Sequence, residues 1–385
     1  MPRRQEPPAA SNAHSSGTEP HRGRPLRVER PGTLFFVTSR TLGERLLLHP
    51  LVEASGLPKN RALRLKLEAY ERANDRWLRK MLSQSHKQRG PFQPKLTLET
   101  AKRLLRGLIG AALARAQDKY GIEVFAAVAM SNHFHIVVRA PDKNLSTAMG
   151  YFKARITEGI NLLYGRRGTL WYRRFDAEPI LDAASCQERV LYTAVNPVRA
   201  GLVPSAEQWP GLLLIGGLGG SGSDTDKDAD TASFEFLNRS AWHEAGRPED
   251  LRPFFETVTL TLSPLPEWAS MPQGSQDRGS SYRDALHAAL EEREAQARAL
   301  ADDEGKKQGS LETLSRVDPQ GRPEAPDRTR RPYVHVRCPD KEKAFKQEVD
   351  ALYEAYPPCS LRFRRQDDLV TFPEGTYPPP LLAAA

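Results

Sequence analysis

The stretch Met130-Ser131-Asn132-His133-Phe134-His135-Ile136-Val137-Val138-Arg139 decides how this chain folds. Its apolar run predicts a β-strand, and Ser131-Asn132 predicts a tight turn in front of it. Side chains alternate between the two faces of a strand, so His133 and His135 share one face while Phe134 points into the core. Two neutral imidazoles one strand repeat apart supply half of a site for a divalent metal ion.

The surrounding sequence predicts an antiparallel sheet. We expect strands at Thr33–Arg40, Ile122–Met130 and His133–Arg139, a short strand or extended segment at Thr169–Phe175, and helices at Leu96–Tyr120, Leu145–Leu163 and Ala184–Val195. The last helix should stop before Pro197, because a proline disfavours α geometry in the residue that precedes it. The order β, α, β, β, α, β, α indicates an α+β fold with an antiparallel sheet and helices mainly on one face.

The 385 residues divide by composition into four regions. We expect a basic, disordered tail at 1–24, a main domain at 25–211 with a helical insertion near 58–96, a flexible Gly/Ser/Asp linker at 212–232, and a partly disordered accessory C-terminal region at 233–385. No apolar run approaches the roughly 20 residues that cross a bilayer. The N-terminus has no hydrophobic segment of a secretory signal, so we expect a soluble, cytoplasmic protein without membrane partners.

Charge is distributed unevenly along the chain. The net formal charge of +8 combines about +16 in residues 1–210 with about −8 in residues 211–385. A basic half of this kind is typical of a protein that meets a polyanion. The alternative is a solvated surface with a charge-balancing tail. Cys186, Cys338 and Cys359 follow no ligand spacing, which predicts reduced thiols rather than disulfides or zinc ligands.

Tyr192 and Asn196 form a second pair of interest. They lie four residues apart in a predicted helix and therefore share one of its faces. A tyrosine can act as a nucleophile, and an amide oxygen can bind a hard cation. Spacing alone leaves another interpretation open, in which Tyr192 is a half-buried helix residue and Asn196 caps the helix end. The two strand histidines can likewise be structural or merely exposed.

Four motifs in a fixed order give these residues a context. They are Pro31-Gly32-Thr33 to Ser39-Arg40, Met130 to His135, Gly168-Thr169-Leu170-Trp171-Tyr172-Arg173-Arg174-Phe175, and Tyr192-Thr193-Ala194-Val195-Asn196-Pro197-Val198-Arg199-Ala200-Gly201. With them the chain resembles the HUH single-tyrosine transposases, and more closely their REP-associated tyrosine transposase branch, over residues 25–211. Three departures are Ser131 for a proline, Tyr172 for a glutamine, and Trp209-Pro210-Gly211 for an aromatic-Ser-Ser sequence.

The resemblance implies a ferredoxin-like (RRM-like) HUH core, with residues 25–211 as the catalytic domain. It implies that Tyr192 is the nucleophile, and that His133, His135 and Asn196 are ligands of Mg²⁺, with Mn²⁺ as an alternative. Further contacts to DNA are expected from Lys153, Arg155, Trp171, Arg173, Arg174 and Arg199. The alternatives are solvated surface charges for the arginines and core packing for Trp171. We assign no role to His243, His287 and His335.

The expected activity is that of a metal-dependent DNA transposase and endonuclease with strand-transfer activity. It would cleave and rejoin single-stranded or hairpin DNA, at inverted repeats, through a 5′-phosphotyrosine intermediate, and we favour a monomer over a homodimer. One alternative is a domesticated protein that binds repeats without productive transposition. Another is a plasmid-type replication initiator or relaxase, which the run Asn196-Pro197-Val198-Arg199-Ala200-Gly201 disfavours.

Overall fold

The computed structural model describes residues 26–50, 98–163, 167–216, 219–220, 230–246, 252–266, 278–303, 309–310, 313–314, 317, 321–323, 333–367 and 369–379. The predicted tail at 1–24 and the predicted insertion near 58–96 lie outside these residues. The chain divides into two compact units, residues 29–350 on the one hand and residues 1–28 with 351–385 on the other. None of the described helices is long and apolar enough to span a membrane.

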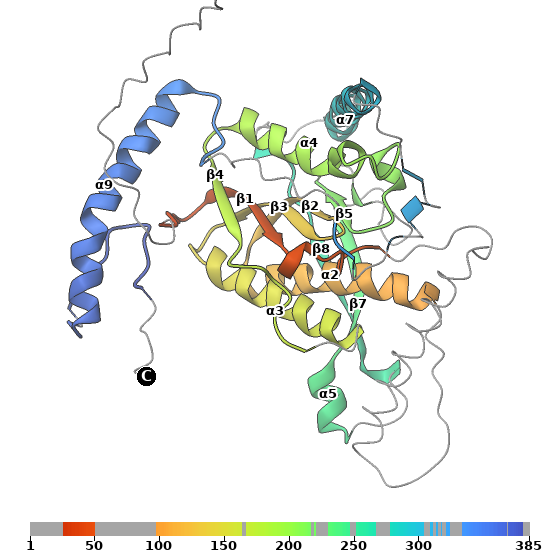
Figure 1. Ribbon diagram of the computed structural model, residues 1–385, viewed down its shortest axis with the longest axis horizontal. Coiled ribbons are helices and arrows are strands. Elements are labelled where there is room, and N and C mark those ends of the chain that lie inside the picture. Colours follow the sequence, from red (N-terminus) through yellow and green to blue (C-terminus); the bar gives the residue numbers. More distant parts are fainter. Residues whose placement is uncertain are drawn as a thin grey trace, which may run out of the picture. The chain divides into compact units, whose positions relative to one another are not determined.

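A six-stranded sheet forms the centre of the larger unit. Its strands are β1 Thr33–Arg40, β2 Glu123–Ala129, β3 His133–Ala140, β4 Asp176–Ile180, β5 Leu213–Ile215 and β6 Gly219–Gly220, in the order β4-β1-β3-β2-β5-β6. Every neighbouring pair is antiparallel. Together with helices α2 Leu98–Tyr120 and α3 Leu145–Leu163, the first four strands follow the chain order β-α-β-β-α-β. In the sheet these four strands lie side by side in the order β4-β1-β3-β2. This confirms the expected ferredoxin-like α+β core (Figure 1).

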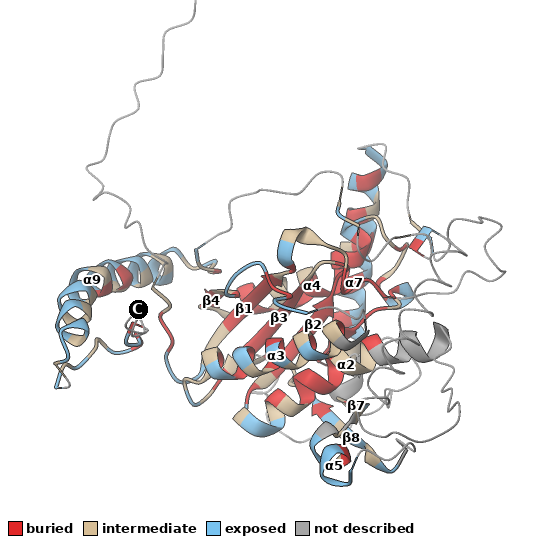
Figure 2. Ribbon diagram, turned by 60° about the horizontal axis from the view of Figure 1, so that its bottom comes forward, coloured by how far each residue is buried: buried red, intermediate tan, exposed pale blue. Residues whose placement is uncertain are grey.

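Helices cover both faces of the sheet. The prediction placed them mainly on one face, and α2 and α3 do share a face, below the sheet in Figure 1. Phe134 points to that side, with its ring 5.2 Å from the ring of Phe152. The other face is covered by α4 Ala183–Arg199, which shares a buried cluster with Phe36 and Val137, and α7 Arg278–Asp303 packs on α4. Buried residues accordingly concentrate in the sheet and on the helix faces turned toward it (Figure 2).

Helix α4 runs past Pro197, so the predicted stop at Val195 is wrong. The helix ends at Arg199, and Gly201 follows with a φ of 65°. A proline removes one N–H donor from the helix ladder, and near the C-terminal end this disturbs only the last turn. A glycine in the left-handed conformation is a common termination signal for a helix. The proline therefore lies inside the last turn, and the glycine marks the end.

Strand β4 differs from its prediction. The segment Thr169–Phe175, expected as a short strand or extended stretch, forms no strand and takes part in an isolated bridge between Thr41 and Trp171. The paired strand begins at Asp176 and contains Glu178 and Pro179. Acidic residues and proline are depleted in strands, and proline is confined largely to edges. β4 is such an edge, which explains why its pattern escaped the prediction.

Several described segments of the predicted linker and accessory region belong to the larger unit. Leu213–Ile215, expected in the linker, pairs with β2 as β5 and is buried. A hairpin of β7 Thr231–Leu237 and β8 Phe255–Thr261 packs on α2. The remaining elements are α5 Arg239–Glu244, α9 Pro339–Arg364 and the 3-10 helices η1 Leu42–Glu44, η2 Ala206–Gln208 and η3 Arg252–Phe254. The boundary drawn at residue 211 therefore cuts through the sheet.

The segment before α9 covers the outer edge of β4. The backbone N–H of His335 donates to the carbonyl of Pro179 at 2.8 Å, and the N–H of Leu181 donates to the carbonyl of His335 at 3.0 Å. These bonds form a parallel bridge between Ile180 and His335. A part of the chain far from β4 in sequence thus satisfies the edge of the main sheet.

Candidate functional site

The two histidines of β3 lie on the face covered by α4, as the strand alternation predicts. Their ring centroids are 4.8 Å apart. His135 is buried, and its Nδ1 lies 2.9 Å from the hydroxyl of Thr38 on β1. His133 Nδ1 lies 2.7 Å from Oδ1 of Asn132, an oxygen that can only accept, so this nitrogen carries the proton. Hydrogen bonds at one ring nitrogen are what orients metal-binding histidines.

Tyr192 meets the histidine pair from helix α4. Its ring centroid lies 5.6 Å from that of His135 and 5.7 Å from that of Phe36, in edge-on geometry in both cases. Asn196 lies one helical turn further along α4 and is buried. The structure thus brings Tyr192 into contact with His135, and it places Asn196 on the same helix.

Two arginines lie against the ring of Tyr192. The guanidinium carbon of Arg189 is 4.8 Å from the ring centroid, and that of Arg199 is 4.9 Å away. Arg199, predicted as a DNA contact, is exposed, whereas Arg189 is half-buried. Burial lowers the pKa of Arg189 from its usual range, and the neighbouring Glu188 carboxylate opposes this effect. The sequence prediction missed Arg189, although its position three residues before Tyr192 places it on a neighbouring helix face.

The start of α4 is fixed by Asp182. Its carboxylate accepts the backbone N–H of Ser185 at 2.7 Å, which caps the helix, and those of Arg337 at 2.7 Å and Cys338 at 3.2 Å. Burial alone would raise the pKa of Asp182, but the hydrogen bonds from Ser185 and Arg337 lower it to about 2. A single carboxylate therefore joins the helix of Tyr192 to the segment before α9.

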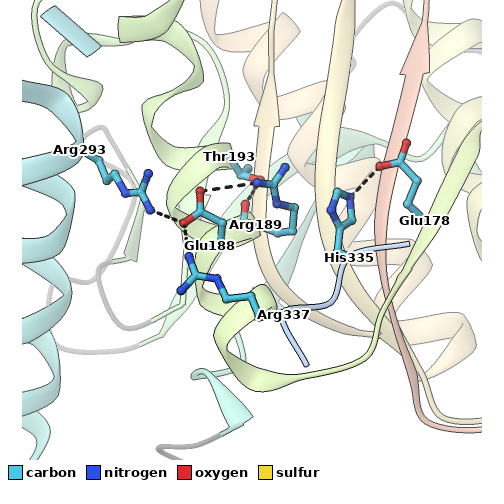
Figure 3. A network of polar contacts seen from close by, with 7 residues as sticks. All are labelled: Glu178, Glu188, Arg189, Thr193, Arg293, His335 and Arg337. Atoms are coloured by element: carbon cyan, nitrogen blue, oxygen red, sulfur yellow. Dashed lines mark hydrogen bonds and ion pairs between the residues drawn. The ribbon is translucent and has the colours of Figure 1, made fainter. Parts of the chain in front are cut away.

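A polar network extends along this side of α4 (Figure 3). Glu188 forms ion pairs with Arg293 of α7 and with Arg337, the latter at 3.3 Å. Beside it, His335 Nε2 lies 2.7 Å from the carboxylate of Glu178 on β4, and both side chains are buried. Sequence patterns assign no role to His335, since its partner lies 157 residues earlier in the chain. Only the fold brings the two together.

Trp171 lies in the core. It is 8% exposed, its Nε1 donates to the carbonyl of Lys153 at 3.1 Å, and its ring contacts that of Phe134 at 5.3 Å. Lys153 is also buried, and its Nζ donates to the carbonyl of Arg173 at 2.9 Å. A platform for an unstacked base needs an open ring face. The burial of Trp171 and Lys153 therefore supports the alternative of core packing, and their DNA contacts stay predictions.

The remaining predicted contacts are spread over the surface. Arg173, Arg174 and the neighbouring Tyr172 are exposed in the loop before β4, where Arg173 forms an ion pair with Asp176 at 3.0 Å. Arg155 lies on α3, across the sheet from Tyr192, with its guanidinium carbon 5.3 Å from the ring of Tyr151. Of the predicted basic contacts, Arg199 is the one that the structure places against Tyr192.

The residues around the histidine pair fit a divalent metal ion. Both rings are oriented through Nδ1, the arrangement that prepares an imidazole to bind metal through its other nitrogen. Within the described ranges, no cluster of three or more His, Cys, Asp or Glu side chains forms. Asn196, whose side-chain oxygen is of the kind that binds hard cations, stays the predicted third ligand. Two imidazoles and one amide suit Mn²⁺ as well as Mg²⁺.

Comparisons with known proteins point to one family. Residues 96–189 match the family model described as IS200-like transposase. The putative REP-associated tyrosine transposase of Haemophilus influenzae is 26% identical over 104 residues, which cover 24% of this chain and 59% of that protein. The chain thus spans less than two thirds of the length of this curated relative. A solved structure of a REP-associated tyrosine transposase bound to a REP hairpin covers 49% of this chain and 80% of that one, at 17% identity and a TM-score of 0.29.

The two sequence matches confirm the resemblance that the motifs predicted. Part of this chain is similar to the IS200-like, single-tyrosine transposases, and in particular to a REP-associated member of that group. The matched segment contains the histidine pair and ends at Arg189, three residues before Tyr192. The nucleophile predicted from the motifs therefore lies just outside the family match.

Proposed function

We propose that this protein is a metal-dependent transposase that cleaves and rejoins single-stranded or hairpin DNA through a 5′-phosphotyrosine. The observation that carries the proposal is the edge-on contact of Tyr192 with His135, between a helix and a strand far apart in sequence. The arginines beside the Tyr192 ring support it, because guanidinium groups bind phosphate. The family resemblance supports the choice of DNA as substrate.

The proposed reaction is a transfer of one phosphoryl linkage. The hydroxyl oxygen of Tyr192 forms a bond to a DNA phosphorus while the bond from that phosphorus to the 3′ oxygen breaks. The phenolic proton is lost, and the leaving 3′ oxygen takes up a proton. The products are a 5′-phosphotyrosine and a 3′-hydroxyl, and the reverse reaction rejoins a strand. Mg²⁺ or Mn²⁺ held by His133, His135 and Asn196 would supply positive charge to the phosphate oxygens.

The proposed partner is DNA with inverted repeats that fold into hairpins. The basic first half of the chain, about +16 over residues 1–210, supports binding to a polyanion. Arg199 at the nucleophile and Arg173 and Arg174 in the loop before β4 are the proposed phosphate contacts. We propose that the protein acts as a monomer.

A covalent-adduct experiment tests this function. A single-stranded hairpin oligonucleotide carrying a label at its 3′ end is incubated with the protein and Mg²⁺ or Mn²⁺, and the products are separated on a denaturing gel. The 3′ label is required because the tyrosine would retain the 5′ end of the downstream fragment. We expect a labelled protein band that depends on the metal ion.

Two variants make the test specific. Tyr192→Phe should abolish the adduct, whereas Tyr172→Phe, at an exposed tyrosine in the loop before β4, should leave it unchanged. An absent adduct with the wild-type protein, or an undiminished one with Tyr192→Phe, rules out the mechanism. Specific hairpin binding without any adduct favours the domesticated repeat-binding protein.

A further inference from the structure

We propose that Arg189 binds the phosphate attacked by Tyr192, and that Glu188 and Arg293 hold Arg189 in position. This inference rests on the proposed function. It assigns part of the site to α7, which lies outside the segment that matches the transposase family. The accessory region would then contribute to DNA cleavage.

The position of Arg189 places a positive charge at the nucleophile. Its guanidinium carbon lies 4.8 Å from the ring centroid of Tyr192 and 5.6 Å from that of Phe36. Arg199 lies against the same tyrosine ring at 4.9 Å. Charge builds on the phosphate oxygens in the transition state, so fixed donors next to the attacking oxygen stabilise it. An arginine also presents two parallel N–H groups, which match the geometry of a phosphate.

The surroundings of Arg189 explain why its side chain is held in place. Glu188 lies 3.6 Å from it and is shared with Arg293 and Arg337 (Figure 3). One carboxylate thus serves three guanidinium groups, so it cannot neutralise all of them. The nearby carboxylate of Glu178 is engaged by His335 at 2.7 Å.

Other charges near this cluster do not remove its positive excess. Asp182 accepts backbone N–H groups of Ser185, Arg337 and Cys338. Counting Glu178, Glu188 and Asp182 against Arg189, Arg199, Arg293 and Arg337 leaves three negative and four positive charges. A net positive cluster beside the nucleophile is favourable for a polyanionic ligand.

The connection to α7 makes the cluster depend on the accessory region. Arg293 projects from α7 to Glu188 on the first half of α4. Without the Arg293 guanidinium, the Glu188 carboxylate would pair only with Arg189 and Arg337. It would no longer be held by α7, and Arg189 would lose the fixed partner that positions it. We therefore expect Arg293 to act through Arg189 as a positioning residue, without touching DNA.

Variants of Arg189 test the phosphate contact. Arg189→Ala should slow adduct formation on the labelled hairpin by about 100-fold at saturating DNA, the scale expected for one transition-state donor. Arg189→Lys, which keeps the charge and loses the planar fork, should recover part of this rate. The slope of log affinity against log salt concentration should also fall by about one for Arg189→Ala, because one phosphate contact is lost. Thermal unfolding of each variant establishes that it is folded.

A matched pair on α7 tests the positioning role. Arg293 and Arg298 lie on the same helix, each side chain is 37% exposed, and each forms an ion pair with a glutamate. Arg298 pairs with Glu294 instead of Glu188. Arg293→Ala should lower the rate at saturating DNA by about tenfold with an unchanged salt slope, whereas Arg298→Ala should leave both unchanged. Equal effects of the two substitutions would assign Arg293 a merely structural role.

The outcomes separate this inference from the proposed function. If the wild-type protein forms an adduct and Arg189→Ala forms it equally fast, the assignment of Arg189 is wrong and the transposase function stands. If the wild-type protein forms no adduct, the proposed function is wrong. In that case, the slope of log hairpin affinity against log salt concentration, compared between wild type and Arg189→Ala, still decides whether Arg189 contacts phosphate.

Discussion

At the scale of single residues, the hydroxyl of Thr38 orients His135. It lies 2.9 Å from Nδ1 in a buried position on the neighbouring strand. Thr38→Val keeps the shape and removes this hydrogen bond. Loss of such an outer partner typically weakens metal binding about 10- to 100-fold. We therefore expect the Mn²⁺ concentration that gives half-maximal adduct formation to rise by this factor.

Ser39 provides the control for Thr38. It is the next residue of β1, it is buried, and its side chain points to the opposite face. Its hydroxyl has no hydrogen-bond partner among the residues that the structure describes. Ser39→Ala should leave the metal requirement unchanged. An equal shift for both variants would show that Thr38 does not act through His135.

His49 predicts a pH dependence of stability. Burial lowers its pKa from 6.5 to about 4, against the hydrogen bond to the carbonyl of Leu314, so the folded protein keeps this ring neutral. The unfolded chain takes up the proton below pH 6.5, and stability falls as the pH drops from about 6.5 to 4. The loss amounts to about 3 kcal/mol at full protonation of the unfolded state. Urea unfolding at pH 7 and pH 4.5 measures it.

The variant His49→Gln isolates this contribution from that of other groups. Glutamine cannot take up a proton, so the difference in unfolding free energy between wild type and variant should shrink as the pH falls from 7 to 4.5. A difference that stays constant across this range would mean that His49 does not keep its depressed pKa in solution.

The sequence could identify site residues that depend on local periodicity. The shared face of His133 and His135 follows from strand alternation, and the shared face of Tyr192 and Asn196 follows from helix spacing. Arg189 and His335 could not be identified in this way. Their significance depends on Glu188 and Glu178, and on segments that only the tertiary fold brings together.

At the scale of secondary-structure elements, two glycines of α3 have opposite surroundings. A Cβ added at Gly159 would lie 1.7 Å from Cδ1 of Leu108 on α2, whereas one added at Gly150 would meet nothing within 4 Å. Gly159→Ala forces the side chain of Leu108 out of its position against α3 and should destabilise the protein by about 1–3 kcal/mol. Gly150→Ala should stabilise it by about 0.5–1 kcal/mol, because alanine favours a helix. Chemical denaturation of both variants gives the comparison, and a stable Gly159→Ala protein would contradict the close packing.

Elements with strong periodic patterns were predictable, and those fixed by distant contacts were not. The strand Thr33–Arg40 and the helix Leu145–Leu163 have the predicted bounds. The strand Asp176–Ile180 was missed, because its residues are weak strand formers and only its pairing with β1 makes it a strand. The extension of α4 past Pro197 likewise depends on the packing of its final turn, with Val198 fully buried.

At the scale of the whole molecule, the accessory region contributes to the core of the larger unit. Leu286 of α7 is 3% exposed and belongs to the buried cluster that contains residues of α4 and the sheet, whereas Leu300 of the same helix is 63% exposed. Leu286→Ala should lower the free energy of unfolding by about 2–5 kcal/mol. Leu300→Ala should change it by less than about 0.5 kcal/mol. Equal, small effects would show that α7 is only loosely attached.

The composition of the chain could not reveal this integration. Glycine-rich and acidic segments around residue 220 are typical of a linker, and they suggested that the domain ends at 211. Yet Leu213–Ile215 joins the sheet, and the helix of Tyr282 and Leu286 covers α4. These contacts form because the sheet and α4, built from residues before 211, present apolar surfaces that later segments cover. The position of such surfaces is known only once the fold is known.

The bridge between Ile180 and His335 also has a consequence for synthesis on the ribosome. His335 is made 155 residues after Ile180, which at about 5–20 residues per second corresponds to roughly 8–30 s. During this time the segment that covers the outer edge of β4 is not yet made, and an open edge can pair with another nascent chain. Pro179 has no backbone N–H that could donate to another strand at this edge. Its carbonyl accepts the N–H of His335 once that residue has been made. Pro179, which is unfavourable within a strand, thus reduces pairing of the open edge with other chains until the segment of His335 has been made.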